Sequence, residues 1–194
     1  MIRTLKARRT LALLLKIDIA KAFDSPSWEF LLELLSARGF GIRWTNWISG
    51  LLATSSTRLN INGDLSEMIK HRCGLRQGDP LSPLLFVIAM DTLESLFKTA
   101  CRYRVFASIG RINMPFQVSI YADDVIAFIN PSNSEMHATV RLLEAFQEVS
   151  GLKANWDKSA ATPIRCEAIA VEAAIEGTNC SSKVFPITYL GLPL

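Results

Sequence analysis

The chain has 194 residues, 49% of them hydrophobic, and carries a formal net charge of +3 at pH 7. This length suits one domain, and the composition provides enough apolar side chains for a sizeable core. The mean hydropathy of +0.23 is high for a complete soluble protein, which indicates that part of the surface meets a neighbour. The mild positive charge permits a nucleic-acid partner without predicting one.

The N-terminal segment, MIRTLKARRTLALLLKID, imitates a secretion signal because basic residues precede apolar ones. Its apolar run from Leu11 to Leu15 is too short for such a signal, and no cleavage site follows. The later run PLLFVIAM is far below the ~20 residues that a bilayer span requires. The cysteines lack zinc-site spacing and are typical of buried, reduced thiols in an intracellular protein. We therefore expect a protein that is neither secreted nor membrane-spanning.

Apolar periodicity, capping residues and turn dipeptides predict the elements of the chain. In chain order they are a strand over 11–19, helices over 25–39 and 42–53, a hairpin over 57–71, a helix from 82 to about 100, a strand–turn–strand unit over 116–129, helices over 134–149 and 164–176, and a short hairpin over 185–194. Ser25 and Ser82, each followed by proline, suit helix starts, and Asn62-Gly63 suits a type I′ turn. The order predicts an α+β fold in which helices back an antiparallel sheet.

Two adjacent acidic residues, Asp123 and Asp124, interrupt the apolar run SIYADDVIAF. Neighbouring carboxylates repel each other, and burying either one is costly without a compensating partner. A solvated hairpin tip explains the pair, because Asp is common in tight turns. A metal site explains it equally well, and these ten residues alone leave both interpretations open.

A third carboxylate, Asp18, ends an apolar strand in KIDIAKAFD, where a single Asp usually caps a helix or lies in a loop. If the fold places it beside Asp123 and Asp124, hard carboxylate oxygens gather in a way that suits Mg²⁺ or Mn²⁺. Two such ions about 3.5–4 Å apart stabilise the attacking and leaving oxygens of a phosphoryl displacement. This arrangement would therefore indicate phosphodiester chemistry, either forming or breaking the bond.

The segments KIDIAKAFDSPSW, GLRQGDPLSPLLF, YADD, SGLKANWDKS and YLGLPL follow one another in the order found in reverse transcriptases. The sequences of these segments resemble the LINE (non-LTR retrotransposon) class, plant members in particular, and the match runs from about Leu13 to Leu194. The resemblance implies a reverse transcriptase domain over 1–194: a polymerase palm that is truncated at both ends, with fingers and thumb largely missing or supplied by neighbouring sequence. It also implies an RNA template, a DNA primer, deoxynucleoside triphosphates and two Mg²⁺ or Mn²⁺ ions, in the nucleus or a cytoplasmic ribonucleoprotein.

The resemblance assigns the metal ligands and the primer contacts at the acidic turn. It makes Asp18 and Asp123 the carboxylates that bridge both ions, with Asp124 alongside. Ala122 is small enough for the primer end to approach the turn, and Tyr121 offers a ring and a hydroxyl to the primer backbone. The last motif, at Tyr189, Leu190 and Gly191, resembles the primer grip, a hairpin that holds the primer 3′ end towards the ions.

The same resemblance implies a nucleotide pocket. Ile19 would offer a backbone amide in a turn to the triphosphate, and Phe23 would lie beneath the sugar and exclude a 2′-hydroxyl. Gln77 would hydrogen-bond the sugar or a base edge, and Gly78 would let the backbone approach the nucleotide or template closely. Without the motifs, Phe23 reads as an ordinary core aromatic and the Gln-Gly pair as a turn before a helix.

Two lysines are candidates for the residue that protonates the leaving pyrophosphate. Lys158 aligns best with the family's lysine, Lys153 is the rival, and both also read as surface lysines. Pro26 departs from the apolar residue expected after Ser25, which the first position of a helix tolerates.

The resemblance predicts RNA-directed DNA synthesis, with doubtful activity for the isolated chain. The alternative is an inactive truncated or adopted fragment that only binds nucleic acid or a protein partner. A two-metal nuclease shares the carboxylates but leaves Phe23 and the glutamine loop unexplained.

Overall fold

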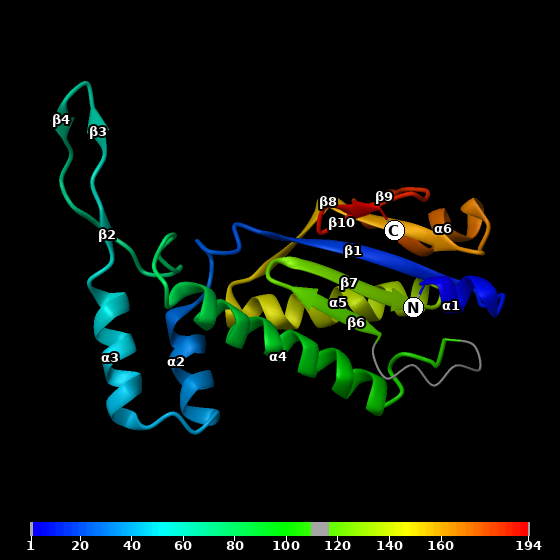
Figure 1. Cartoon of the computed structure of the whole chain (residues 1–194), viewed down its shortest axis with the longest axis horizontal. Helices are drawn as coiled ribbons and strands as arrows, with labels where there is room; N and C mark the ends of the chain where they lie inside the picture. The colour runs from blue at the N-terminus through cyan, green and yellow to red at the C-terminus, as the bar shows by residue number, and fades with distance from the viewer. Residues whose placement is uncertain (1, 110–116, 194) are drawn as a thin grey trace.

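A five-stranded sheet organises the computed structural model, which describes residues 2–109 and 117–193. The strand order is β6 (Val118–Tyr121), β7 (Asp124–Ile129), β1 (Ala12–Ala20), β8 (Lys153–Ile164) and β9 (Ser181–Ser182) (Figure 1). Neighbouring strands are antiparallel except β8 and β9, which are parallel. The strand β1 lies in the middle because its apolar residues face both sides of the sheet and bury almost completely.

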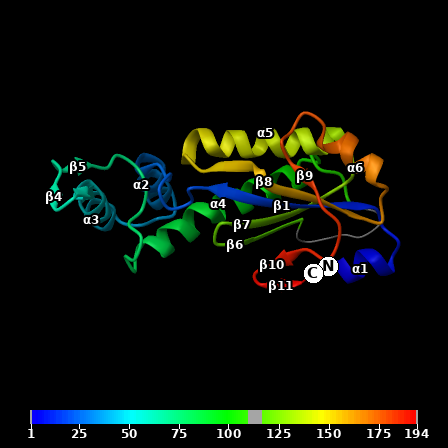
Figure 2. The same ribbon diagram turned by 90° about the horizontal axis from the view of Figure 1, so that it is seen from above.

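Three helices cover one face of the sheet: α4 (Ser82–Arg102), α5 (Asn133–Ser150) and α6 (Ala168–Ile175). On this face Leu15 and Ile17 pack into the main core with Phe86 and Phe146. The other face carries a smaller core, which includes Leu14 of β1. It is covered by α1 (Ile2–Ala7) and by the segment that leads to the hairpin of β10 (Thr188–Tyr189) and β11 (Leu192–Pro193) (Figure 2).

A long arm projects from the end of the sheet where β1 finishes (Figure 1). It consists of α2 (Trp28–Ala37), α3 (Ile42–Ala53) and two strand pairs, β2 (Ser56–Thr57) with β5 (Ile69–Lys70) and β3 (Asn60–Ile61) with β4 (Asp64–Leu65). Its surface exposes large apolar side chains, among them Ile42, Trp47 and Ile61. The arm therefore carries apolar surface that the core does not bury.

The predicted α+β architecture is confirmed, with its helices packed on a sheet of mostly antiparallel strands. The helix over 42–53 has the predicted bounds, and Asn62 and Gly63 form the tip of the β3–β4 hairpin with positive φ values of 55° and 99°. The predicted Ser25 cap is wrong. The hydroxyl of Ser27 accepts from the Phe30 amide instead, so α2 begins at Trp28 and Pro26 precedes it.

Two further boundaries differ from the sequence prediction. Ser82 is already helical and Leu81 is the N-cap residue, without a side-chain cap, so the predicted Ser82 cap is wrong. The Asp79 carboxylate accepts from the Leu81 amide at 2.8 Å just before the helix. The strand β8 and the helix α1 were not predicted at all. Because β8 continues to Ile164, the predicted helix over 164–176 shortens to α6.

The glycine at the end of α5 yields a prediction about stability. Gly151 has φ +76°, and a Cβ atom there would collide with the Ser25 carbonyl oxygen at the start of the arm. Gly177 has a similar φ of +80° but open space around it. We expect Gly151→Ala to lower the free energy of unfolding by about 1–3 kcal/mol more than Gly177→Ala, since overpacking adds to the shared backbone strain. Denaturant unfolding of both variants measures the difference, and equal losses would contradict the close contact.

Candidate active site

The adjacent acidic residues lie at a hairpin turn. Tyr121 pairs with Asp124 across β6 and β7, which leaves Ala122 and Asp123 as the turn between the strands. Ala122 adopts a left-handed conformation with φ 53°. Tyr121, Ala122 and Asp123 are exposed, whereas Asp124 is half-buried. The hairpin-tip interpretation of this pair is therefore confirmed, and the solvated turn explains how two carboxylates stand side by side.

The turn lies at the same end of the sheet as the last residues of β1, which include Asp18 (Figure 1). Asp18 is directly opposite Asp124 in the β1–β7 register, and both are half-buried. Like charges directly opposite on neighbouring strands destabilise a sheet. Lys16 offsets part of this repulsion, because its Nζ lies 3.7 Å from an Asp124 carboxylate oxygen. The fold thus brings Asp18, Asp123 and Asp124 to one edge of the molecule.

The three carboxylates supply hard oxygen donors, which Mg²⁺ and Mn²⁺ prefer. Among the described residues, however, no three His, Cys, Asp or Glu side chains gather closely enough to hold a metal ion. The ligand types therefore fit a divalent cation, while the cluster expected from the sequence is not formed in this arrangement of side chains.

An irregularity in β8 supports Asp18 from the other side. The β1–β8 register shifts between Lys16, which faces Ala160, and Asp18, which faces Asn155. The fully buried Ser159 turns inwards at this bulge. Its hydroxyl oxygen accepts from the Asp18 amide at 3.2 Å and its hydroxyl donates to the Asn155 carbonyl at 2.6 Å. Ser159 thereby fixes the backbone that carries Asp18.

Both candidate lysines belong to β8 and are exposed. Lys158 lies in the bulge, next to Ser159, whereas Lys153 opposes Ala20 at the end of β1. Ile19 opposes Ala154 within the sheet and is buried, so the prediction that it lies in a turn is wrong. The chain leaves the sheet only after Ala20, because β1 pairs with β8 up to that residue.

The glutamine loop packs against the segment that follows β1. The Leu75 amide donates to the Phe23 carbonyl at 2.6 Å, and the Gln77 side-chain amide donates to an Asp24 carboxylate oxygen at 3.3 Å. These contacts place Phe23 and Gln77 in one region, as the predicted nucleotide pocket requires. The Phe23 ring also stacks on Phe86, with centroids 5.1 Å apart, and packs partly buried against the core. Phe23 thus has structural contacts whether or not it meets a nucleotide.

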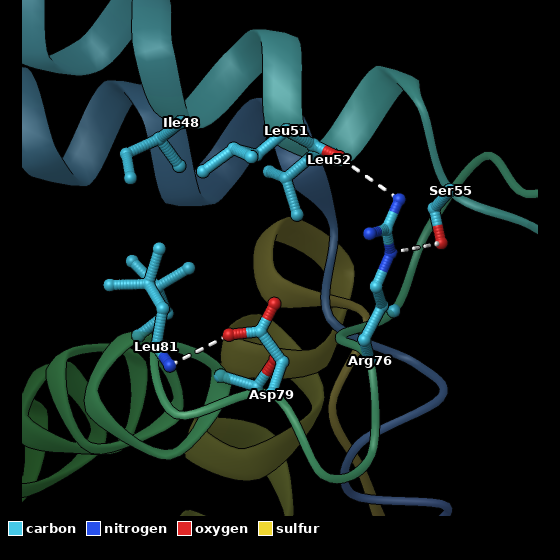
Figure 3. A pocket seen from close by; sticks show the side chains of 10 residues that line it. Ile48, Leu51, Leu52, Ser55, Arg76, Asp79 and Leu81 are labelled. Carbon is cyan, nitrogen blue, oxygen red and sulfur yellow. Dashed lines mark hydrogen bonds between the residues drawn. The ribbon is translucent and has the colours of Figure 1, made fainter.

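Arg76 connects the same loop to the end of α3 (Figure 3). Its guanidinium donates to the Leu51 carbonyl at 3.4 Å and to the hydroxyls of Thr54 and Ser55 at 3.0 and 3.4 Å. The neighbouring pocket measures only about 20 Å³, room for about one water molecule. This pocket is too small for a nucleotide. Arg76 also borders a larger open pocket of about 360 Å³ with Asp24 and Gln77.

The C-terminal hairpin approaches the acidic edge. Leu190 and Gly191 form its turn, with φ values of 50° and 76°. The Thr188 carbonyl accepts from Lys16 Nζ at 3.2 Å. Burial raises the pKa of the Tyr189 hydroxyl, Ser119 lowers that pKa, and the Asp124 carboxylate raises it. The C-terminal hairpin therefore lies beside Lys16 and Asp124.

The sequence of residues 2–194 matches the family described as "Reverse transcriptase (RNA-dependent DNA polymerase)". The chain belongs to this family. One curated relative is the type-2 retrotransposable element R2DM polyprotein of Drosophila melanogaster, to which the chain is 31% identical over 142 residues. This match covers 73% of this chain and 13% of the relative. It is 28% identical over 171 residues to a type-1 R2 polyprotein of Popillia japonica. This match covers 88% of this chain and 22% of the relative. It is 30% identical over 155 residues to the transposon TX1 149 kDa protein of Xenopus laevis. This match covers 79% of this chain and 12% of the relative.

These reverse transcriptase relatives are proteins of non-LTR retrotransposons, and the chain spans only 12–22% of their length. Solved structures share the fold. Telomerase from Candida albicans, in complex with a fragment of telomeric RNA, aligns with a TM-score of 0.59 at 14% identity, covering 81% of this chain and 29% of that one. Apo telomerase from Candida tropicalis aligns with a TM-score of 0.60 at 14% identity. The alignment covers 86% of this chain and 34% of that one.

Sequence reasoning missed two residues at the candidate site, Lys16 and Ser159. Lys16 precedes Asp18 by two positions, so strand alternation places both on one face of β1 and gave a usable signal. Ser159 had no such signal, because its role depends on the β8 bulge. Among residues 2–109 and 117–193, no helix combines the length and apolar character of a membrane span.

Proposed function

We propose that this reverse transcriptase domain is the palm of a LINE-type enzyme, which extends a DNA primer on an RNA template with deoxynucleoside triphosphates. The observation that carries the proposal is the register that places Asp18 opposite Asp124, with Asp123 at the adjoining turn. The glutamine loop and the C-terminal hairpin approach the same edge from two sides, through the Gln77–Asp24 and Lys16–Thr188 contacts. These are the elements that a primer terminus and a nucleotide would need.

Asp18 and Asp123 would hold both Mg²⁺ or Mn²⁺ ions, with Asp124 beside them. When bound, two such ions stabilise the attacking and leaving oxygens of the phosphoryl displacement. The half-buried Asp18–Asp124 pair would keep negative charge fixed at this edge, and Lys16 would limit its repulsion. The bulge that Ser159 stabilises would hold Asp18 in position.

The remaining groups would act on the substrates. The Phe23 ring would leave no room for a ribose 2′-hydroxyl. Gln77 and Gly78 would approach the nucleotide or template. Tyr121 and the hairpin turn at Tyr189, Leu190 and Gly191 would align the primer. Lys158 would protonate the leaving pyrophosphate, since it lies in the β8 bulge between the Lys16–Ala160 and Asp18–Asn155 pairs, and Lys153 is the alternative donor.

One observation favours a second candidate function. The described carboxylates do not form a ready three-ligand cluster, as expected for an inactive fragment that only binds nucleic acid or a protein partner. A chimera separates the two candidates, in which residues 2–194 replace the matching segment of the Drosophila relative. Extension of an oligo-dT primer on poly-A with Mg²⁺ or Mn²⁺ supports the polymerase. Nucleic-acid binding by a folded chimera that never extends the primer supports the inactive fragment.

The Ser159 contact gives a prediction specific to Asp18. Ser159→Ala should lower kcat for primer extension in that chimera by about tenfold, because one hydrogen bond that positions the Asp18 backbone is lost. KM for the nucleotide should change little. Ser182→Ala, an exposed serine on β9, is the matched control. Unchanged kcat in Ser159→Ala would show that the bulge does not position Asp18.

A further inference from the structure

The helix α3 lies on the outer side of α2 in the arm and carries a stripe of exposed apolar side chains (Figure 1). Trp44, Trp47 and Leu51 are 39%, 55% and 52% exposed, whereas Ile48 and Leu52 of the same helix are buried in the main core. The exposed residues are three and four positions apart, so they follow one line along the helix. This is the spacing with which helices pack side chains against a second helix.

The two tryptophans of the stripe are held in place within the arm. Their rings meet edge to face, with centroids 6.3 Å apart. The Arg43 guanidinium lies over the Trp47 ring at 5.1 Å from its centroid. Because these contacts restrict the ring positions before any partner binds, less conformational entropy is lost on association.

A glycine in the middle of α3 adds a second feature to this surface. Gly50 is exposed, and a Cβ atom at this position would meet no heavy atom within 4 Å. Glycine within a helix is about 1 kcal/mol less favourable than alanine, and nothing in the single chain requires it here. Less than one turn from the large Trp47 side chain, α3 therefore has a gap that a side chain of another molecule can enter.

The large side chain and the gap fit each other across a two-fold axis. In an antiparallel pair of α3 helices whose axis passes midway between Trp47 and Gly50, each Trp47 lies over the Gly50 of the other copy. With about 3.6 residues per turn, Trp44 and Leu51 lie on one flank of that contact. The same axis brings the Leu51 of one copy beside the Trp44 of the other. One helix thus supplies both halves of the interface.

The charges of α3 favour the antiparallel pair over a parallel one. The helix contains no acidic residue and one basic residue, Arg43. In the antiparallel pair Arg43 lies level with the Thr54 of the other copy, which separates the two guanidiniums by about 16 Å along the helix axes at ~1.5 Å per residue. This separation exceeds the Debye length of about 10 Å at 0.1 M salt. A parallel pair would place the two Arg43 side chains together.

We propose that α3 binds the α3 of a second copy of this chain, in an antiparallel two-fold pair with Trp47 packed over the Gly50 of the other copy. One pair of short helices buries less than the ~800 Å² per partner of a standard interface. We therefore expect a reversible dimer with a Kd of about 10–100 μM. The proposal is independent of the proposed polymerase, because it uses no residue to which that function assigns a role.

Sedimentation equilibrium of the 194-residue chain, from about 2 to 200 μM, tests the proposal. Gly50→Leu fills the gap and should raise the dimer Kd at least about tenfold. It should not lower the thermal stability of the monomer, since leucine has the higher helix propensity and meets open space. Trp47→Ala should also raise Kd about tenfold. Tyr103→Ala removes an exposed aromatic outside the arm and should leave Kd unchanged.

Combining Trp47→Ala with Gly50→Leu exchanges the large and the small residue. The double variant should return Kd to within about threefold of the parent, because only direct contact between these two positions predicts such a rescue. The proposal is overturned if the chain stays monomeric at every concentration, if Gly50→Leu associates like the parent, or if the double variant is no better than the single ones. Association that Ile61→Ser abolishes and Gly50→Leu does not would assign the contact to the β3–β4 hairpin and also overturn it.

Discussion

Asp123→Asn and Asp18→Asn should each reduce primer extension in the chimera by at least about a thousandfold while the fold is retained. An amide cannot supply the anionic oxygen that a divalent ion needs, and a thousandfold loss corresponds to about 4 kcal/mol of barrier. Asp124→Asn should be severe but incomplete, because Asp124 lies beside the proposed bridging ligands. Single-turnover extension with Mg²⁺ measures the rate constants.

The control for charge alone is Asp64→Asn, at the exposed tip of the arm. It removes one carboxylate far from the β6–β7 turn and should extend primers at the parental rate. Thermal unfolding confirms that all variants fold. Extension by Asp123→Asn within tenfold of the parent would remove Asp123 from the catalytic assignment.

Phe23→Val should let the polymerase accept ribonucleotides about 10- to 100-fold better relative to deoxynucleotides, because the ring that excludes the 2′-hydroxyl is gone. Deoxynucleotide incorporation should fall much less, since the aspartates and the glutamine loop remain. Competition between each deoxynucleotide and the corresponding ribonucleotide gives the ratio of their kcat/KM values directly.

The stack between Phe23 and Phe86 makes a structural control necessary. Phe86→Leu removes that stack and part of the core but leaves the Phe23 ring in place. It should lower stability without changing sugar selectivity. If Phe86→Leu relaxes selectivity as much as Phe23→Val does, Phe23 acts only as a core aromatic and the proposed gate is wrong.

Local signals made much of the fold predictable from sequence. The continuous apolar run of β1, the Asn62-Gly63 turn and the glycine after α5 are determined by residues close in sequence, and these elements lie where predicted. The strand β8 was missed because alanines such as Ala160 and Ala161 have high helix propensity. Pairing with β1 overrides that propensity, which no local pattern reports.

The candidate site was predictable in its residues but not in its geometry. Motif resemblance selected Asp18, Asp123 and Asp124, yet the register that opposes Asp18 to Asp124 depends on strands more than 100 positions apart. The Ser159 contact depends on a bulge in a strand that was not predicted. Such long-range contacts are selected by packing of the whole sheet rather than by local sequence.

The central claim, that divalent ions bind between Asp18 and the β6–β7 turn, is tested most directly by metal-directed cleavage. Fe²⁺ substituted for Mg²⁺ in the presence of ascorbate and peroxide generates radicals that cut the backbone beside the bound ion. The account predicts cuts near residues 18 and 123–124, suppressed by excess Mg²⁺ and absent from Asp123→Asn. Cuts confined to other segments, or a cutting pattern that Asp123→Asn leaves unchanged, would contradict it.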